Sequence, residues 1–131
     1  MRAGRVLRQI VIARIKAQVP DLGGRVYDKA TEGTVYPFAS MGPSDWVDES
    51  VECIKARSIS LQIDVWGSRS NKGALEDLTD DVATALDGFA DEERLTMHPI
   101  RVLQVQVMDD PDGSTVHGIV RIEVDVEQDD G

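Results

Sequence analysis

The run of residues closest to a known chemical motif is LQIDVWGSRSNKGALEDL, at positions 61–78, where glycines, serines and a lysine separate a strand pattern from a helix pattern. A phosphate-binding loop has this layout, but it requires Gly-x-x-x-x-Gly-Lys-Ser/Thr, because its amides cradle the phosphates and its hydroxyl holds magnesium. Here Lys72 precedes Gly73, and Ala74 stands where the hydroxyl is needed. The preceding strand pattern alternates polar and apolar residues, whereas a buried parallel strand is almost entirely apolar. We therefore interpret the run as a strand-to-helix corner with a polar, basic rim.

A second candidate is the acidic cluster Asp109-Asp110-Pro111-Asp112-Gly113, which has the carboxylates and the glycine of a calcium loop. A calcium loop also needs a bidentate glutamate further along the chain, and Ile119, Val120 and Arg121 occupy that region. Proline and Asp-Gly supply the backbone angles of a turn. The cluster therefore predicts the turn of a hairpin.

The histidines and the cysteine show no catalytic or metal-binding spacing. His98 precedes a proline and His117 falls on the polar face of a strand pattern, so we expect both to be surface or half-buried residues. The single cysteine, Cys53, cannot form an internal disulfide, and we expect it to be buried, reduced and structural. No pair of carboxylates stands out as an acid and a base. The sequence therefore predicts no catalytic, cofactor-binding or metal-binding residues, and no enzyme.

The overall charge of the chain is strongly negative. The 131 residues include 24 acidic and 14 basic ones, which gives a net charge of -10, and 41% are hydrophobic, which fits one domain with a substantial core. Such a surface repels phosphate backbones, which argues against binding of nucleic acids. No apolar run approaches the roughly 20 residues of a membrane-spanning helix. Arg8, Arg14 and Lys16 interrupt the apolar start of the chain, which is unlike a signal peptide.

Hydrophobic periodicity predicts the elements that position these residues. Helical spacing predicts helices over 3–18 and 73–88, with Gly88 as an end cap. Alternation of polar and apolar residues predicts strands at 57–66, 101–108 and 115–126. Two further strands are predicted, at 25–28 after the Gly23-Gly24 turn and at 35–41. Residues 42–53 are polar and acidic, and they fit a long flexible loop or the tip of a hairpin. The order α-β-β-β-α-β-β predicts a single α+β domain over residues 1–131, with a mainly antiparallel sheet, both helices on one face and a disordered C-terminal end.

Three placements of apolar side chains can be tested against the structure. In the first helix, Ile12 and Ile15 widen the apolar surface beyond one stripe, so the protein's own core or a neighbouring subunit must cover it. Alternation in the strand at 101–108 places one set of apolar residues on a common face: Leu103, Val105 and Val107. Trp66 ends its strand, and we expect it to pack at the rim of the core.

Positive charge is concentrated at the start of the chain. Five basic residues precede the first acidic one, Asp21: Arg2, Arg5, Arg8, Arg14 and Lys16. The other residues then hold 24 acidic against 14 minus 5, or 9, basic ones, a charge of -15. We expect a molecule with a positive end on a negative body, in which Arg5 and Arg8 belong to a contact surface.

Two further contact surfaces are predicted. Acidic residues surround Trp46 in sequence: Asp45, Asp48, Glu49 and Glu52. An exposed tryptophan in such a segment is often an interface anchor, although folding back onto its own domain is an equal alternative. Asp45 and Trp46 form one candidate surface, and Arg69 and Lys72 at the strand-to-helix corner form the other.

Four segments, taken in order, match a known family. They are Val26-Tyr27-Asp28, Tyr36-Pro37-Phe38, Asp64-Val65-Trp66 with the link at 67–73 and the helix at 75–86, and DPDGSTVHG at 110–118. With this order and spacing, the chain resembles the tail-terminator proteins of long-tailed phages and gene transfer agents, also called tail-completion or minor tail proteins. The resemblance runs from Val6 to Val126, and the acidic residues 42–53 and 91–93 depart from it.

The resemblance implies a structural role in virion assembly. Members of the family look like small α+β subunits that form a ring, typically a hexamer, on the head-proximal end of the tail tube. The expected partners are other copies of the chain, the tail-tube protein and a neck or head-completion protein, with no cofactor, no sequence-specific nucleic acid and no membrane. The expected location is the virion tail of a phage, prophage or gene transfer agent, after assembly in the bacterial host cytoplasm.

Two alternatives remain open beside the tail terminator: a tail-tube or head–tail connector subunit, and a small ligand-binding α+β module.

The distribution of charge also fits a ring. Subunits of a ring contact each other head to tail through two different patches, and a basic helix beside an acidic body supplies such a pair. An acidic surface around a DNA conduit would also let DNA slide, because phosphates are repelled.

Overall fold

A computed structural model describes residues 2–31 and 33–128 of the chain. The helices are α1 (Ala3–Gln18) and α2 (Lys72–Leu86), and two short 3-10 turns, η1 (Pro20–Leu22) and η2 (Arg69–Asn71), precede later elements. The strands are β1 (Val26–Tyr27), β2 (Phe38–Asp48), β3 (Ala56–Ser68), β4 (Arg101–Asp109) and β5 (Thr115–Glu127). The helices and strands occur in the predicted order. The disordered end expected after the last strand falls on residues 129–131, which lie outside the described residues.

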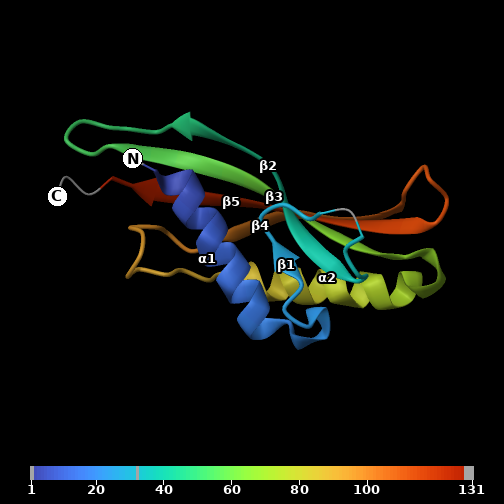
Figure 1. The fold of residues 1–131 in the computed structure, drawn as a ribbon. Coiled ribbons are helices and arrows are strands. Elements are labelled where there is room, and N and C mark those ends of the chain that lie inside the picture. The colour runs from blue at the N-terminus through green and yellow to red at the C-terminus, as the bar shows by residue number, and fades with distance from the viewer. Residues whose placement is uncertain (1, 32, 129–131) are drawn as a thin grey trace.

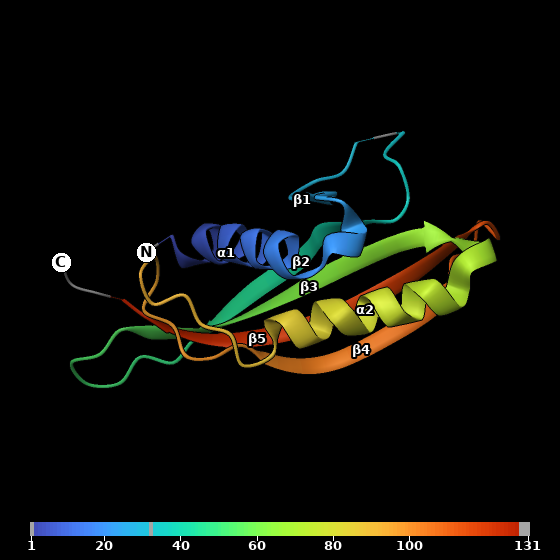
Figure 2. The same cartoon turned by 90° about the horizontal axis from the view of Figure 1, so that it is seen from below.

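The strands form one five-stranded sheet in the order β1-β2-β3-β5-β4, with both helices on the same face (Figures 1 and 2). β2, β3, β5 and β4 pair in antiparallel fashion, and the short β1 pairs with β2 in parallel. The predicted α+β class, with a mainly antiparallel sheet and two helices on one face, is confirmed.

The core lies between the helices and the two central strands. Alternate residues of β3 and β5 face the helices and are buried: Ile59, Leu61, Ile63, Val65, Val120, Ile122, Val124 and Val126. From α2 the buried stripe includes Leu75, Leu78, Val82 and Leu86. Removal of this apolar surface from water is the main force that holds the helices on the sheet. Neither helix in the described part of the chain is long and apolar enough to cross a membrane.

The unusually apolar surface of α1 is covered within the same chain. Ile15 is fully buried, and Ile12 is partly buried against the same core. The Arg14 guanidinium lies over the Phe89 ring, 4.3 Å from its centroid, and its Nε donates to the Ala85 carbonyl at 2.9 Å. Of the two alternatives for Ile12 and Ile15, the protein's own core is therefore the one observed.

Residues 42–48 were expected in a loop or hairpin tip, and this is wrong, because β2 runs through them to Asp48. The pairing with β3 shifts register between Met41 and Ser44, so the glycine and proline at 42 and 43 form a bulge instead of ending the strand. Only residues 49–55 remain as the hairpin tip. Long-range pairing with β3 overrides the local turn preference, since it provides backbone partners for the polar segment.

Three placements of single side chains also differ from expectation. A register shift after Val102 turns Leu103 outward, where it is 56% exposed, and Val102 packs against the core in its place. Cys53 is exposed, with a φ of 70°, because it lies in the hairpin tip beyond the core. Trp66 does not join the core rim; it lies on the opposite face of the sheet and stacks on His117.

Candidate interaction surfaces

The face of the sheet away from the helices carries a half-buried polar cluster. His117 Nε2–H donates to Asp64 Oδ1 at 2.7 Å, and Gln62 Nε2–H donates to the same oxygen at 2.8 Å. The Trp66 and His117 rings are stacked, with centroids 3.8 Å apart and planes at 10°. The indole N–H of Trp66 donates to Ser40 Oγ at 3.3 Å. These contacts link β2, β3 and β5 through side chains on a face that no helix covers.

Gly42, in the β2 bulge, leaves room for the Asp64 carboxylate. A Cβ at this position would lie 2.6 Å from Asp64 Oδ2 and 3.1 Å from the Gln62 carbonyl oxygen. Because Gly42 has no side chain, the Asp64 carboxylate can lie against the bulge, where it accepts both hydrogen bonds. A His–Asp pair can orient a general base, but no hydrogen bond joins His117 to a hydroxyl or thiol within residues 2–31 and 33–128. The arrangement can order the sheet surface.

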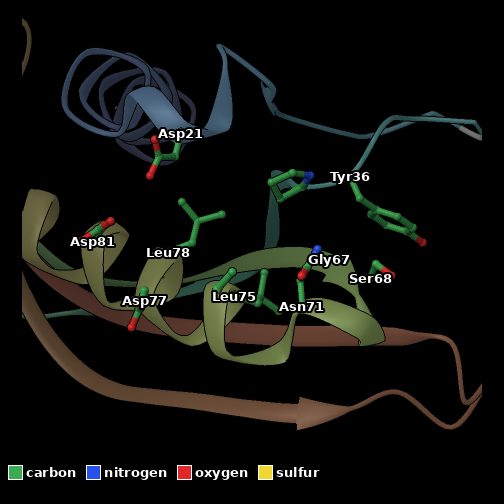
Figure 3. Close-up of a pocket in the computed structure, with 11 residues that line it drawn as sticks. Asp21, Tyr36, Gly67, Ser68, Asn71, Leu75, Asp77, Leu78 and Asp81 are labelled. Carbon is green, nitrogen blue, oxygen red and sulfur yellow. The ribbon is translucent and has the colours of Figure 1, made fainter.

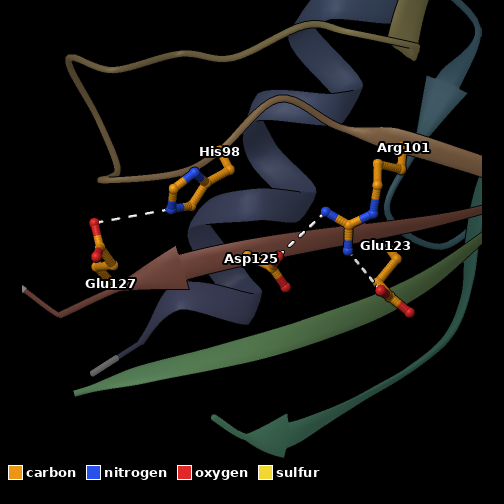
Figure 4. Close-up of polar contacts among 5 residues, drawn as sticks. All are labelled: His98, Arg101, Glu123, Asp125 and Glu127. Atoms are coloured by element: carbon orange, nitrogen blue, oxygen red, sulfur yellow. Dashed lines mark hydrogen bonds and ion pairs between the residues drawn. The ribbon is translucent and has the colours of Figure 1, made fainter. Parts of the chain in front are cut away.

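A second polar network joins the edge strand β4 to β5 (Figure 4). The Arg101 guanidinium donates to Glu123 Oε1 and, at 3.2 Å, to Asp125 Oδ2. Both hydrogen bonds raise the pKa of Arg101 above its ordinary value, and the bond to Glu123 has the larger effect. His98 Nε2, just before β4, lies 3.9 Å from Glu127 Oε2. The network positions β4, the outer strand of the sheet, which pairs with β5 on one side and with no strand of the described sheet on the other.

The basic corner between β3 and α2 is engaged with the rest of the chain. Arg69 donates from Nη1 to the Gly113 carbonyl at 2.9 Å, and Lys72 Nζ lies 3.5 Å from Asp109 Oδ2. Both contacts join the start of α2 to the β4–β5 turn. Arg69 and Lys72 therefore have a structural role here, and their predicted role in a contact with another subunit stays a prediction.

A groove of about 320 Å³ lies between the first half of α2, η1 and the chain before β2 (Figure 3). Its floor includes Pro37, Leu75 and Leu78. Two carboxylates lie beside Leu78 in the close-up, Asp21 from η1 and Asp81 from α2. Sequence reasoning missed this groove because its two walls come from segments that are distant in the chain. The acidic side of α2 was the only available signal.

A projecting arm carries half of the large apolar residues that are exposed in the described part of the chain. We call residues 44–55, the outer half of β2 with the hairpin tip, the arm; it extends past the helices at the end of the molecule where α1 begins (Figure 1). Its exposed apolar side chains are Trp46 (53% exposed), Val47 (65%), Val51 (66%) and Ile54 (45%). The Arg57 guanidinium lies 3.7 Å from the centroid of the Trp46 ring. Trp46 is thus partly covered by its own chain and still presents a large apolar surface.

The arginines at the start of α1 form a basic surface, but not all of them are available for a contact with another molecule. Arg8 Nε donates to Asp28 Oδ1 at 2.8 Å, so its charge is already paired. Arg2 and Arg5 are exposed and make no ion pair or side-chain hydrogen bond with the described residues. Of the two predicted contact residues, only Arg5 is unpaired within the described residues, as is Arg2, and a role in a contact stays a prediction.

The predicted site residues do not form one patch. Arg5 and Arg8 lie on α1, Asp45 and Trp46 on the arm, and Arg69 and Lys72 at the start of α2, toward the other end of the molecule (Figures 1 and 2). An open polar sheet face, a projecting apolar arm and separate charged patches are typical of a subunit that contacts several neighbours. The class of protein that these features define is an assembly subunit.

Comparison with known families shows which family the chain belongs to. The family model for tail completion protein gp17 matches residues 11–127. The chain belongs to this family, and its expected role as a structural component of a phage-like tail is confirmed. The acidic residues 42–53, which depart from the residues that carry the resemblance, lie within the matched range.

Solved structures share the fold at low sequence identity. A chain in the virion of a native gene transfer agent (GTA) particle has a TM-score of 0.77 and 19% identity, with 90% of this chain and 92% of that chain covered. The gp17 protein of bacteriophage SPP1 has a TM-score of 0.60 and 21% identity, with 100% and 96% covered. No curated protein matches the sequence.

Proposed function

We propose that the protein forms a ring that caps the head-proximal end of a phage-like tail tube and joins the tube to the capsid neck. Membership of the tail completion family and the likeness to a chain of a gene transfer agent virion support a place in the tail. The partners are further copies of the chain, the tail-tube protein and a neck protein. Assembly would precede incorporation into the virion and take place in the host cytoplasm.

The observation that carries the proposal is the exposed apolar arm. Large apolar side chains that stay exposed together on one segment mark a protein contact. Trp46 and Val51 belong to a segment that projects from the core, so they would enter a recess on another molecule. The recess and the arm are different surfaces, and contacts between unlike surfaces generate closed rings or open filaments.

The polar sheet face supports a second part of the proposal, the passage of DNA. It carries carboxylates such as Asp45, Glu123 and Asp125, and the whole chain has a net charge of -10. If this face lines the ring, its charge repels the phosphates of DNA that passes through. Arg101 is held by Glu123 and Asp125, which limits its attraction for phosphate.

Negative-stain electron microscopy of the purified protein over a wide concentration range tests the proposal. Closed rings of uniform size would support a tail terminator, and long tubes would identify a tail-tube subunit instead. If only monomers are seen, isolated tail tubes are added; binding at one tube end supports the cap, and its absence contradicts it. The double variant Trp46→Ser/Val51→Ser should lose assembly, whereas Val35→Ser, at a residue 66% exposed away from the arm, serves as the matched control.

The groove beside α2 favours one alternative function, that of a small ligand-binding module. Its volume of about 320 Å³ is near the lower limit of ligand pockets, which span roughly 300–1,000 Å³. A small ligand-binding module would show a rise in melting temperature with a metabolite, because binding to the folded state alone stabilises it. A thermal-shift screen with common metabolites separates this alternative from the ring.

A further inference from the structure

We propose that the groove receives the basic start of α1 from a second copy of this chain, so that successive subunits join head to tail. The inference rests on the proposed ring function and names one contact between its subunits. It involves Arg2 and Arg5 of one copy and the acidic rim of the groove, Asp77 and Asp81, of the next.

The groove has an apolar floor with unpaired carboxylates at its rim. Leu75 and Leu78 contribute the floor from α2, and Asp21 and Asp81 lie beside Leu78 in the close-up (Figure 3). The lining carboxylates, which also include Asp77, make no ion pair or hydrogen bond with the described residues. Their mutual repulsion is therefore relieved only by solvent or by a positive partner.

The start of α1 supplies a side-chain type that suits both parts of the groove. Arg2 and Arg5 are exposed and unpaired within the described residues, unlike Arg8, which is held by Asp28 at 2.8 Å. An arginine has an apolar stem and a guanidinium that forms paired hydrogen bonds with carboxylates. The stems would lie on the floor while the guanidinium groups reach the rim.

The positions of the two surfaces favour a second copy as the occupant. α1 begins at one end of the molecule, whereas the groove lies beside the first half of α2, toward the other end (Figures 1 and 2). The two surfaces are therefore apart within one subunit. Each copy carries both halves of the contact, and a contact between unlike patches propagates from subunit to subunit until a ring closes.

Reciprocal charge reversal tests this contact. In the first variant, Arg2→Glu/Arg5→Glu makes the helix start acidic; in the second, Asp77→Lys/Asp81→Lys makes the rim basic. Either variant alone places like charges together, whereas an equimolar mixture restores opposite charges at every contact of an alternating ring. Glu76→Lys/Asp80→Lys is the matched control, since it makes the same change of charge on the same helix outside the groove lining.

Sedimentation velocity at low salt provides the readout, with circular dichroism to confirm folding. The wild type and the control should associate alike. Each reversed variant should associate at least about tenfold more weakly, because like charges at an interface oppose binding. The mixture should recover association and favour even-numbered assemblies. The milder variants Arg5→Gln and Asp81→Asn should show partial losses, which tests the contact without charge reversal.

Two results would overturn the contact without removing the proposed function. Rings that persist in either reversed variant would mean that the subunits join elsewhere. A wild type that stays monomeric at millimolar concentration but still caps tail tubes would mean that this contact does not link subunits. Failure of the wild type to cap tubes would instead count against the ring function itself.

Discussion

At the scale of single residues, the polar sheet face is held by a few closely placed side chains. The Asp64 side chain is 11% exposed and that of His117 is 15% exposed, although no helix covers them. A carboxylate with so little access to water requires hydrogen-bond donors, and Gln62 and His117 supply them. The stack of Trp66 on His117 then fixes the ring that donates.

Removal of the His117 ring should therefore be costly. His117→Ala deletes the donor at 2.7 Å and the partner of the Trp66 stack, and we expect the free energy of unfolding to fall by roughly 1–3 kcal/mol. Urea denaturation followed by tryptophan fluorescence measures the loss. His98→Ala is the control, because that side chain is 58% exposed and its loss should change stability by less than about 0.5 kcal/mol. Equal effects of the two substitutions would contradict a structural role for the cluster.

The β4–β5 turn should loosen in acid. The backbone N–H of Ser114 donates to Asp112 Oδ1 at 2.9 Å and the Thr115 hydroxyl donates to Oδ2 at 2.8 Å, and together they lower the pKa of Asp112 below its ordinary value of 3.8. The folded pKa is the lower one, so the stabilisation is present above the unfolded pKa and is lost as pH falls through the folded pKa. Amide exchange at Ser114 and Thr115, corrected for its intrinsic pH dependence, should lose protection on acidification. In Asp112→Asn this change should be absent, and an unchanged pH response there would contradict the assignment.

At the scale of elements, α2 and β5 approach each other closely at one point. Gly118 in β5 faces Thr79 of α2, and a Cβ at position 118 would overlap the Thr79 side chain. Thr79 is fully buried and donates from its hydroxyl to the Leu75 carbonyl at 2.7 Å, so it cannot move aside freely. The glycine therefore sets the distance between helix and strand.

Gly118→Ala should destabilise the protein by about 1–3 kcal/mol, the usual cost of overpacking a core. The loss should be smaller in the Thr79→Ala background, because the overlapping hydroxyl is gone; a double-mutant cycle in urea measures this coupling. Gly73→Ala is the control, since its Cβ would meet nothing within 4 Å and it lies in a helix, where alanine is favoured. Additive effects of Gly118→Ala and Thr79→Ala would contradict the close approach.

The elements themselves could be predicted in type and order from the sequence, but their edges could not. The alternation of Ile59 to Val65 and of Val120 to Val126 identified the buried faces, because half-buried strands must alternate. The bulges at Met41/Ser44 and at Val102/Gln104 were not visible, because a bulge depends on the partner strand. They moved Leu103 to the surface and carried β2 through a segment that resembled a loop.

At the scale of the whole molecule, charge and apolar surface are distributed over separate places. The free arginines of α1, the acidic groove and the apolar arm each face outward in the described structure. A net charge of -10 also opposes association with DNA. The molecule thus presents separate surfaces suited to contacts with proteins, and its net charge disfavours contact with DNA.

We therefore expect no binding to duplex DNA at micromolar concentration and about 0.1 M salt, a condition in which charge at longer range is screened. Fluorescence anisotropy of a labelled duplex, titrated with the wild type, measures this. Arg101→Glu, which replaces a cation of the sheet face, should leave the result unchanged, because Glu123 and Asp125 already hold that guanidinium. Micromolar binding by the wild type would contradict a repellent lining.

Four features could be predicted before the fold was known: the class of fold, the order of the elements, the buried faces of the central strands and the likeness to tail-completion proteins. Those features follow from local periodicity and from residue order, which the chain carries without folding. The folded chain was needed to show which arginines of α1 are unpaired, that Arg69 and Lys72 contact the β4–β5 turn, and that Asp21 and Asp81 line one groove. Such pairings join residues from distant segments, and the packing of α1 and α2 on the sheet brings them together.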